Sequence, residues 1–271
     1  MAQSDWITTG LGNAVQKGQE AEASRQYGPD RYWIPTGKSR ELVFVDVEAG
    51  AFREHNYKKD GDWKNWLTCA APLMDAGEVA PCCAALGADS AYLVSMLTIV
   101  DCDKWTDKKG NTRQYELKAY PAKFKTAQKL ERKHGDLAKE GKALSGRLYR
   151  VTRETDKSPS VGDDFEYVRD VDMEKLFSLV TYKGKKLAEL FAQAESDEAL
   201  FAKLARTFQV MKGPDGKIPR KLVPFNYQKL YWPKTPAEIK AILTGYKKPD
   251  DDDRDSKSSG SSKGADEEVP F

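Results

Sequence analysis

A chain of 271 residues with 39% hydrophobic and 32% charged residues is large and apolar enough to form a real core under much solvated surface. No apolar run reaches the roughly 18 residues needed to cross a bilayer, and the N-terminus lacks the basic-then-apolar pattern of a signal peptide, so the sequence excludes membrane partners and predicts a cytoplasmic protein. The net charge of +2 hides an asymmetry, because the last 22 residues carry eight acids and three bases while the first 249 carry 41 bases and 34 acids.

A polar N-terminal arm is expected at residues 1–28, because its weak helical stretch has too few apolar positions to bury a face. Residues 29–171 alternate between strand-like runs and turn residues. One helix is expected among them over 121–136, with Pro121 near its start and Gly135 just past its end. The expected strands are 31–36, 40–47, 51–57, 63–69, 91–102, 113–120, 146–154 and 164–171.

After residue 171 the apolar residues recur three and four positions apart, which indicates helices. We expect them over 172–180, 184–194 and 196–208, with Asp172 and Ser196 as N-caps, and a last short helix over Pro236–Leu243. The sequence thus predicts a mainly β protein of the α+β class. Its parts are an OB-fold-like Greek-key barrel with an inserted helix at 29–171, a helical extension packed on the barrel at 172–248, and a disordered acidic tail at 249–271.

Basic and aromatic residues interleave along residues 51–69 and again near 31–40 and 146–157. Single-stranded nucleic acid favours this mixture, because its bases stack on flat side chains for about 1–3 kcal/mol each while Lys and Arg follow the phosphates. For any one aromatic the alternative is a place in the core, and a slip of one residue in strand register would exchange core and groove. The residues expected to bind a single strand are Trp33, Lys38, Arg40, Arg53, Tyr57, Trp63, Lys118, Tyr149, Arg150 and Arg153.

The charge asymmetry amounts to a body of +7 and a tail of −5. A basic body suits a polyanionic partner, and an acidic tail can occupy the same groove as an internal competitor. The simpler alternative is a solubilising tail on a mildly basic enzyme.

The chain ends in Asp266-Glu267-Glu268-Val269-Pro270-Phe271, behind an acidic Ser/Gly-rich linker. A solvated tail has no core of its own for an aromatic residue, so we expect a partner to receive Phe271. The ending resembles the C-terminal tip of bacterial single-stranded-DNA-binding proteins. The resemblance implies that the tip docks on replication and recombination enzymes, with the Phe in an apolar pocket and the acids on neighbouring bases.

The body, over about residues 32–168, is more similar to the single-stranded-DNA-binding proteins of tailed bacteriophages. The similarity lies in the order YWIP, GKSRELVFVD, FREHNY, WLTC, CC, GADSAYLVSMLTIVD and LSGRLYRVTRETDKSPSVGDDFEYV. It implies an OB-fold body and a zinc site made by a His on an early strand, a Cys, and a Cys-x-x-Cys-like pair.

His55, Cys69, Cys82 and Cys83 stand in the order of that zinc site, but an adjacent pair replaces the Cys-x-x-Cys. Neighbouring residues rarely aim both sulfurs at one ion, so Cys102 is another candidate for the fourth ligand. The alternative is a lost site whose small cysteines fill the core. Disulfides are not expected, because four cysteines in so long a chain do not form a disulfide framework.

The sequence predicts a protein without enzymatic activity that coats and protects single-stranded DNA in phage replication, recombination and repair. It has only two histidines and lacks the common catalytic motifs, while the acids at 162–164 are explained by a turn. Two alternatives stay open: a metal-assisted nuclease, which needs a convergent acidic cluster, and a protein-interaction module that ignores nucleic acid. No cofactor is required, and structural zinc is the one that the resemblance suggests. The sequence leaves the oligomeric state open, including self-association on DNA.

Overall fold

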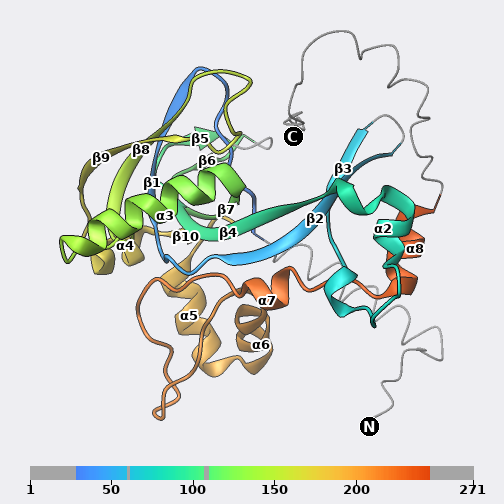
Figure 1. Ribbon diagram of the computed structural model, residues 1–271. Coiled ribbons are helices and arrows are strands. Elements are labelled where there is room, and N and C mark those ends of the chain that lie inside the picture. Colours follow the sequence, from blue (N-terminus) through green and yellow to red (C-terminus); the bar gives the residue numbers. More distant parts are fainter. Residues whose placement is uncertain (1–28, 60–61, 107–109, 245–271) are drawn as a thin grey trace.

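The computed structural model describes residues 29–59, 62–106 and 110–244, and for residues 58–59 and 62–66 it describes the backbone alone. The expectations for the arm at 1–28 and for the tail at 249–271 therefore lie outside the described residues. These include the roles given to Asp266, Glu267, Glu268, Val269, Pro270 and Phe271. In Figure 1 the described chain forms one large sheet with helices around it and a small lobe at the far end of strands β2 and β3.

Strand β4 (Ala91–Asp101) is the centre of the sheet. Strand β7 (Glu116–Lys123) pairs with it antiparallel over most of its length. On the other edge of β4, strand β2 (Gly50–Lys59) pairs with its first half and strand β1 (Lys38–Phe44) with its second half. Strand β4 therefore has three antiparallel neighbours, two of them in tandem along one edge.

The remaining strands extend the sheet outward from these neighbours. They are β8 (Arg147–Arg153) and β9 (Asp164–Asp170) beyond β1, β3 (Asp62–Thr68) beside β2, and the two-residue strands β10 (Thr181–Tyr182) and β11 (Lys185–Lys186) beyond β7, while β5 (Trp105–Thr106) and β6 (Thr112–Arg113) pair separately. The predicted α+β class is confirmed. The sheet is not a closed barrel, because within the described residues the ladder ends at β9 and β11 and does not close on itself.

The central strands are buried on both faces of the sheet. Along β4, Val94, Met96 and Val100 belong to one hydrophobic cluster, and Leu97 and Ile99 belong to another. Successive side chains of a strand point to opposite faces. A strand covered on both sides therefore has a continuous apolar run instead of an alternating one.

Different helices cover the two faces (Figure 1). Helix α3 (Phe124–Lys139) contributes Leu130 to the cluster of Leu97 and Ile99. The helices of the C-terminal extension bury their apolar residues in the other cluster, so sheet and extension share one core. These helices are α4 (Met173–Leu179), α5 (Leu187–Ser196) and α6 (Glu198–Thr207).

Of the two predicted N-caps, one is confirmed and the other is wrong. The Asp172 side chain accepts hydrogen bonds of 3.0 Å from two backbone N–H groups at the start of α4, which confirms it as an N-cap. Ser196 is wrong as a cap, because it is the last residue of α5 and Asp197 accepts the capping bond from the Leu200 N–H at 2.9 Å. Ser and Asp are both favoured N-caps, so two adjacent candidates cannot be separated by residue type.

Helix α3 lies three residues further along the chain than expected. Pro121 belongs to β7, where it lies opposite Met96, so the helix cannot begin there. Gly135 lies inside the helix and does not end it; Gly141, with a φ of 69°, follows the observed end. The expected strand at 31–36 is reduced to a single bridge from Arg31 to β7.

The lobe has a hydrophobic core of its own. Its members include Tyr57 of β2, three cysteines, and Ile239 and Leu243 of helix α8 (Pro236–Leu243). Helix α8 was expected from the sequence and is confirmed, and it packs on helix α2 (Pro81–Leu86) in the lobe. The two 3-10 turns of this region are η1 (Ala71–Leu73) and η2 (Ala88–Ser90).

A polar contact fastens the C-terminal segment to the sheet. The hydroxyl of Tyr227, in helix α7 (Tyr227–Leu230), donates to Asp46 Oδ2 at 2.8 Å and lies 2.7 Å from Thr98 Oγ1. Thr98 Oγ1 also accepts the Phe225 N–H at 2.8 Å. The Tyr227 side chain lies directly on Gly50, where a Cβ atom would come within 2.4 Å of it, so this position requires glycine.

Replacing Asp46 with Asn should remove a pH dependence of stability. Burial raises the pKa of Asp46 to about 6, above its usual value near 4, so the folded state holds this proton more tightly than the unfolded state. The stabilisation is fully present below about pH 4 and is lost as the pH rises through about 6. Urea unfolding between about pH 4 and 7 should show the wild type losing about 2–3 kcal/mol relative to Asp46→Asn. Equal pH profiles for the two proteins would contradict this.

Candidate functional site

Four side chains that can ligate a metal converge in the lobe. The ligand atoms of His55, Cys69, Cys82 and Cys83 all lie within 4.8 Å of one another, and all four residues are buried. Strand β2 supplies the histidine, the residue after β3 supplies Cys69, and the start of helix α2 supplies the adjacent pair. The cluster could therefore hold a metal ion.

The distances inside the cluster suit a single shared ion. Cys69 Sγ lies 3.4 Å from Cys83 Sγ, which lies 3.7 Å from His55 Nε2. Around a tetrahedral ion with metal–sulfur bonds of about 2.3 Å, neighbouring ligand atoms lie about 3.5–3.8 Å apart. Small side-chain adjustments would be enough to admit an ion.

The hydrogen bonds of His55 direct its lone pair at the cysteines. Ser90 Oγ donates its proton to the Gly87 carbonyl at 2.7 Å, so its oxygen accepts the proton of His55 Nδ1 at 2.8 Å. A neutral imidazole protonated at Nδ1 keeps its lone pair on Nε2, the atom that faces Cys83. Metal-binding histidines are commonly oriented by such an outer hydrogen bond.

The Cys83 thiol does not ionise easily on its own. Burial, followed by contact with Cys69, raises the pKa of the Cys83 thiol to about 12. At neutral pH this thiol stays protonated unless a bound cation compensates for the buried charge.

The adjacent cysteines converge, contrary to the expectation from their spacing. Cys82 and Cys83 lie in the first turn of α2, and Cys82 Sγ also accepts the Ala70 N–H at 3.4 Å. Cys102, the other candidate ligand, lies just beyond β4, where its thiol donates to the Val100 carbonyl at 3.6 Å. It is not part of the cluster.

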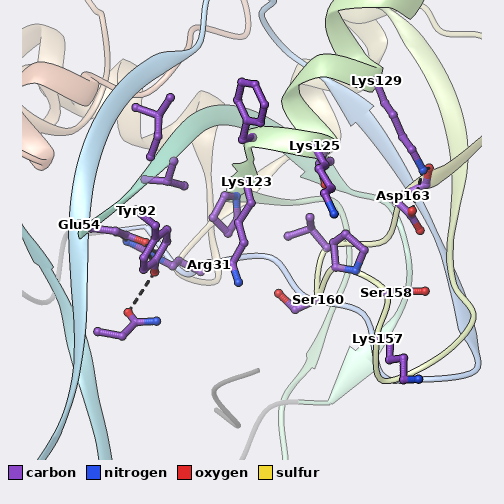
Figure 2. A pocket seen from close by; sticks show the side chains of 18 of the residues that line it. Arg31, Glu54, Tyr92, Lys123, Lys125, Lys129, Lys157, Ser158, Ser160 and Asp163 are labelled. Carbon is purple, nitrogen blue, oxygen red and sulfur yellow. Dashed lines mark hydrogen bonds and ion pairs between the residues drawn. The ribbon is translucent and has the colours of Figure 1, made fainter. Parts of the chain in front are cut away.

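A pocket of about 570 Å³ lies between strands β2, β4 and β7, the start of α3 and the loop that joins β8 to β9. Lys123 and Lys125 both point toward its middle, and Lys157 lies on the loop opposite (Figure 2). Leu93 and Phe124 add apolar surface, with 43% and 59% of their area exposed. The pocket thus combines cations with exposed apolar side chains, at a volume typical of ligand sites.

One wall of this pocket is a hydrogen-bonded network. Arg31 donates to both carboxylate oxygens of Glu54, at 2.8 and 2.6 Å. The Tyr92 hydroxyl lies 2.7 Å from Glu54 Oε1 and 3.0 Å from Asn56 Oδ1 (Figure 2). Because its bidentate pair with Glu54 engages the guanidinium, Arg31 shapes the wall rather than offering a spare charge.

The lysines of the pocket differ in what they already contact. Lys129 pairs with Asp163 at 2.6 Å, and the Lys123 ammonium lies 5.5 Å from the centre of the Tyr92 ring. Lys125 and Lys157 make no ion pair with another residue in the described part of the chain. These two are the most available cations for an anionic ligand.

Among the described side chains, none of the residues expected to bind DNA lines this pocket. Tyr57, Lys118, Tyr149 and Arg153 are buried, with at most 7% of their surface exposed. Lys118 donates to Asp101 at 2.8 Å and lies over an indole ring at 4.0 Å. All four are core side chains in this fold, and their assignment to the DNA site stays a prediction.

Of the other six expected residues, those with described side chains lie apart from the pocket. Arg40 pairs with buried Asp101 at 3.2 Å, and exposed Arg150 pairs with Glu41 and Glu166 at 3.0 and 3.2 Å. A role for these residues in DNA binding stays a prediction. Lys38 and Arg53 are exposed, Trp33 lines a second cavity, and the Trp63 side chain lies outside the described residues.

The sequence analysis did not select the lysines and the phenylalanine of this pocket, although their sequence pattern could have indicated them. Lys123-Phe124-Lys125 has the same mixture of bases and an aromatic that selected the other segments. It was assigned to the interior of a helix over 121–136. The observed boundary between β7 and α3 falls at Lys123, which places the three residues at a strand-to-helix junction on the pocket rim.

No protein-family model and no curated protein matches this sequence. Of the helices in the described ranges, none combines the length and the apolar character required to cross a membrane. The functional evidence therefore comes from the residues of the two sites themselves.

The histidine–cysteine cluster should bind one divalent metal ion per chain. Adding Co²⁺ to reduced, metal-free protein should produce thiolate-to-cobalt charge-transfer absorption, which Cys69→Ser should abolish. Ser90→Ala keeps all four ligands but removes the outer hydrogen bond of His55, so it should weaken metal affinity roughly 10- to 100-fold.

The matched control for this experiment is Cys102→Ser, which removes one thiol outside the cluster. It should bind cobalt like the wild type. The same absorption and stoichiometry in Cys69→Ser as in the wild type would rule the site out.

Proposed function

We propose that this protein binds single-stranded DNA without acting on it chemically, and that the strand lies in the pocket between β2, β4, β7 and α3. The observation that carries the proposal is the meeting of Lys123, Lys125 and Lys157 with exposed Phe124 in one pocket. Lysines neutralise phosphates, and an exposed aromatic ring accepts an unstacked base. A duplex exposes no base faces, so the aromatic surface favours a single strand.

The charge of the pocket supports a polyanionic ligand. Two of its cations are balanced by partners within the lining, Arg31 by Glu54 and Lys129 by Asp163. Summed over its five basic and two acidic residues, the lining carries a net charge of +3. The charged lining residues are Arg31, Lys123, Lys125, Lys129, Lys157, Glu54 and Asp163.

An OB-fold-like Greek-key topology belongs to the same proposal. Strands β1, β4, β7 and β8 all bury aromatic or aliphatic residues in one cluster, among them Phe44, Tyr120 and Tyr149. A curved antiparallel sheet around such a cluster is compatible with an incomplete barrel. Together with the resemblance to the phage proteins, it supports a role in coating and protecting strands exposed during replication, recombination and repair.

Zinc is the metal that we propose for the cluster of His55, Cys69, Cys82 and Cys83. One histidine and three cysteines are a common structural zinc set. Four protein ligands fill a tetrahedron, so such an ion would stabilise the lobe core and would leave no position for a catalytic water. The cluster therefore does not favour the alternative of a metal-assisted nuclease.

The acidic tip at Asp266–Phe271 is proposed as the contact for partner enzymes. The support is its sequence alone, an apolar residue, a proline and a C-terminal Phe behind three acids. A small interface of this kind depends on one buried aromatic anchor, with charged neighbours adding specificity.

Substitutions in the pocket should separate charge from stacking. Lys125→Ala should lower the slope of log affinity against log salt by about one ion, because one phosphate contact is lost. Phe124→Ala should weaken binding about 5- to 100-fold with little change in slope, since a stacked base is lost. Fluorescence titrations with oligo(dT) over a range of salt concentrations measure both quantities.

The matched control is Lys217→Ala, which removes an exposed lysine outside the pocket. It should leave both the slope and the affinity near the wild-type values. If Lys125→Ala and Phe124→Ala also behave like the wild type, the pocket is not the DNA site. If wild-type protein ignores single strands, a protein-interaction module becomes the better description.

Deleting residues 250–271 should tighten single-strand binding, most strongly at low salt, where attraction between the −5 tail and the +7 body is least screened. Phe271→Ala keeps the acids, so DNA affinity should stay near wild type while capture of a replication enzyme falls. Filter binding and pull-down measure the two effects. Unchanged DNA affinity without the tail, together with intact partner capture by Phe271→Ala, would reduce the tail to a solubilising extension.

A further inference from the structure

A second cavity of about 500 Å³ shares Arg31 with the first pocket. Its lining combines three aromatic side chains, Trp33, Tyr231 and Trp232, with the exposed cation Lys234. The segments that supply them lie at opposite ends of the described chain, one just before β1 and the other between α7 and α8. The fold thus brings together a group that no local sequence pattern contains.

Two of these rings face solvent. Trp33 is 38% exposed although its neighbours Tyr32 and Ile34 are fully buried, which is what alternation along an extended backbone produces. Trp232 is 56% exposed. Large apolar side chains gathered at one exposed site indicate a surface that a ligand covers.

Trp232 is exposed but its backbone is well anchored. On one side, the Tyr231 N–H bonds to the Tyr227 carbonyl at 2.9 Å, and Tyr227 is fastened to the sheet. On the other side, Thr235 forms a capping box at the start of α8, whose Ile239 is fully buried. A ring presented on a fixed segment loses little conformational entropy when it accepts a partner.

Tyr231, which lines the second cavity, packs against Phe52 and Arg31. Its ring stacks on Phe52 with centroids 4.7 Å apart, and the guanidinium carbon of Arg31 lies 6.0 Å from its centre. Arg31 in turn is held by Glu54 in the wall of the first pocket. Arg31 therefore borders both the first pocket and the second cavity.

We propose that the second cavity is a further stacking site for the same single strand, in which one base packs on Trp33 or Trp232 while Lys234 meets a phosphate. This inference rests on the proposed DNA-binding function and extends it. Every base offers a flat face, so stacking on exposed indoles is independent of sequence. The charge of the cavity also suits a phosphate, because the acid of its lining, Asp30, is already paired with Lys183.

If a strand contacts the two cavities one after the other, its binding should depend on the length of the oligonucleotide. A short oligonucleotide fills only the first pocket, whereas a longer one also reaches the second cavity. Losing the Trp232 ring should therefore affect long oligonucleotides and spare short ones. Losing Phe124 in the first pocket should weaken both.

The test compares wild type, Trp232→Ala, Phe124→Ala and the control Met211→Ala with oligo(dT) of about 4 to 16 nucleotides. Met211 is a 79% exposed apolar residue outside both cavities. Trp232→Ala should bind the longest oligonucleotides about 5- to 100-fold more weakly than wild type, with an unchanged salt slope and normal binding of the shortest. Photo-crosslinking with 5-iododeoxyuridine oligonucleotides should join the long wild-type complex at Trp33 or Trp232, identified by mass spectrometry.

The outcomes separate this inference from the function on which it rests. If wild-type protein binds no single strand, the proposed function itself fails. If it binds, but Trp232→Ala matches wild type at every length and neither tryptophan is crosslinked, only the second site is overturned. An equal loss for the shortest and longest oligonucleotides would also overturn the arrangement of two contacts in series.

Discussion

The antiparallel ladder of β4 is the constraint on which the other features depend. Its edge passes from β1 to β2 at Thr98, whose N–H bonds to the Asp46 side chain at 3.2 Å. Where β4 pairs with β1, at residues 99–101, the sheet is buried on both faces. Where β4 pairs with β2, at residues 91–96, the two strands run outward to the lobe. They carry Glu54 and Tyr92 to the wall of the first pocket, and His55 to the metal cluster. One strand pair thus positions both sites.

Burial divides the basic residues of this protein into two groups. Lys118 and Arg40 both contact the fully buried carboxylate of Asp101, because a charge removed from water must be paired. Such ion pairs hold neighbouring strands together, and the buried Lys118 is not available to a ligand. Lys125 and Lys157 lie on a helix start and a loop, where no structural partner is needed. The cations able to meet phosphates are therefore the ones that the core does not use.

Local patterns were sufficient to predict most strands and four of the five helices described after residue 171, with α7 missed. They did not predict which side of a strand faces the core. Tyr149 was assigned to a groove, whereas the pairing of β8 with β1 turns it inward beside Phe44. That register is set by contacts more than a hundred residues apart. The metal ligands were found by residue type and order. Their convergence could not be predicted, because it depends on the six-residue helix α2, too short to show a period.

The lobe and the second cavity are built from adjoining segments of the chain. Thr68 lines the cavity and immediately precedes Cys69 of the metal cluster, while helix α8, which anchors the segment of Trp232, packs into the lobe core. An ion that stabilises the lobe would therefore also hold one wall of the cavity in place. The first pocket is built mainly on the central sheet and α3, which have a separate core. On this arrangement a bound metal would affect the proposed DNA binding through the second cavity rather than through the lysine-lined pocket.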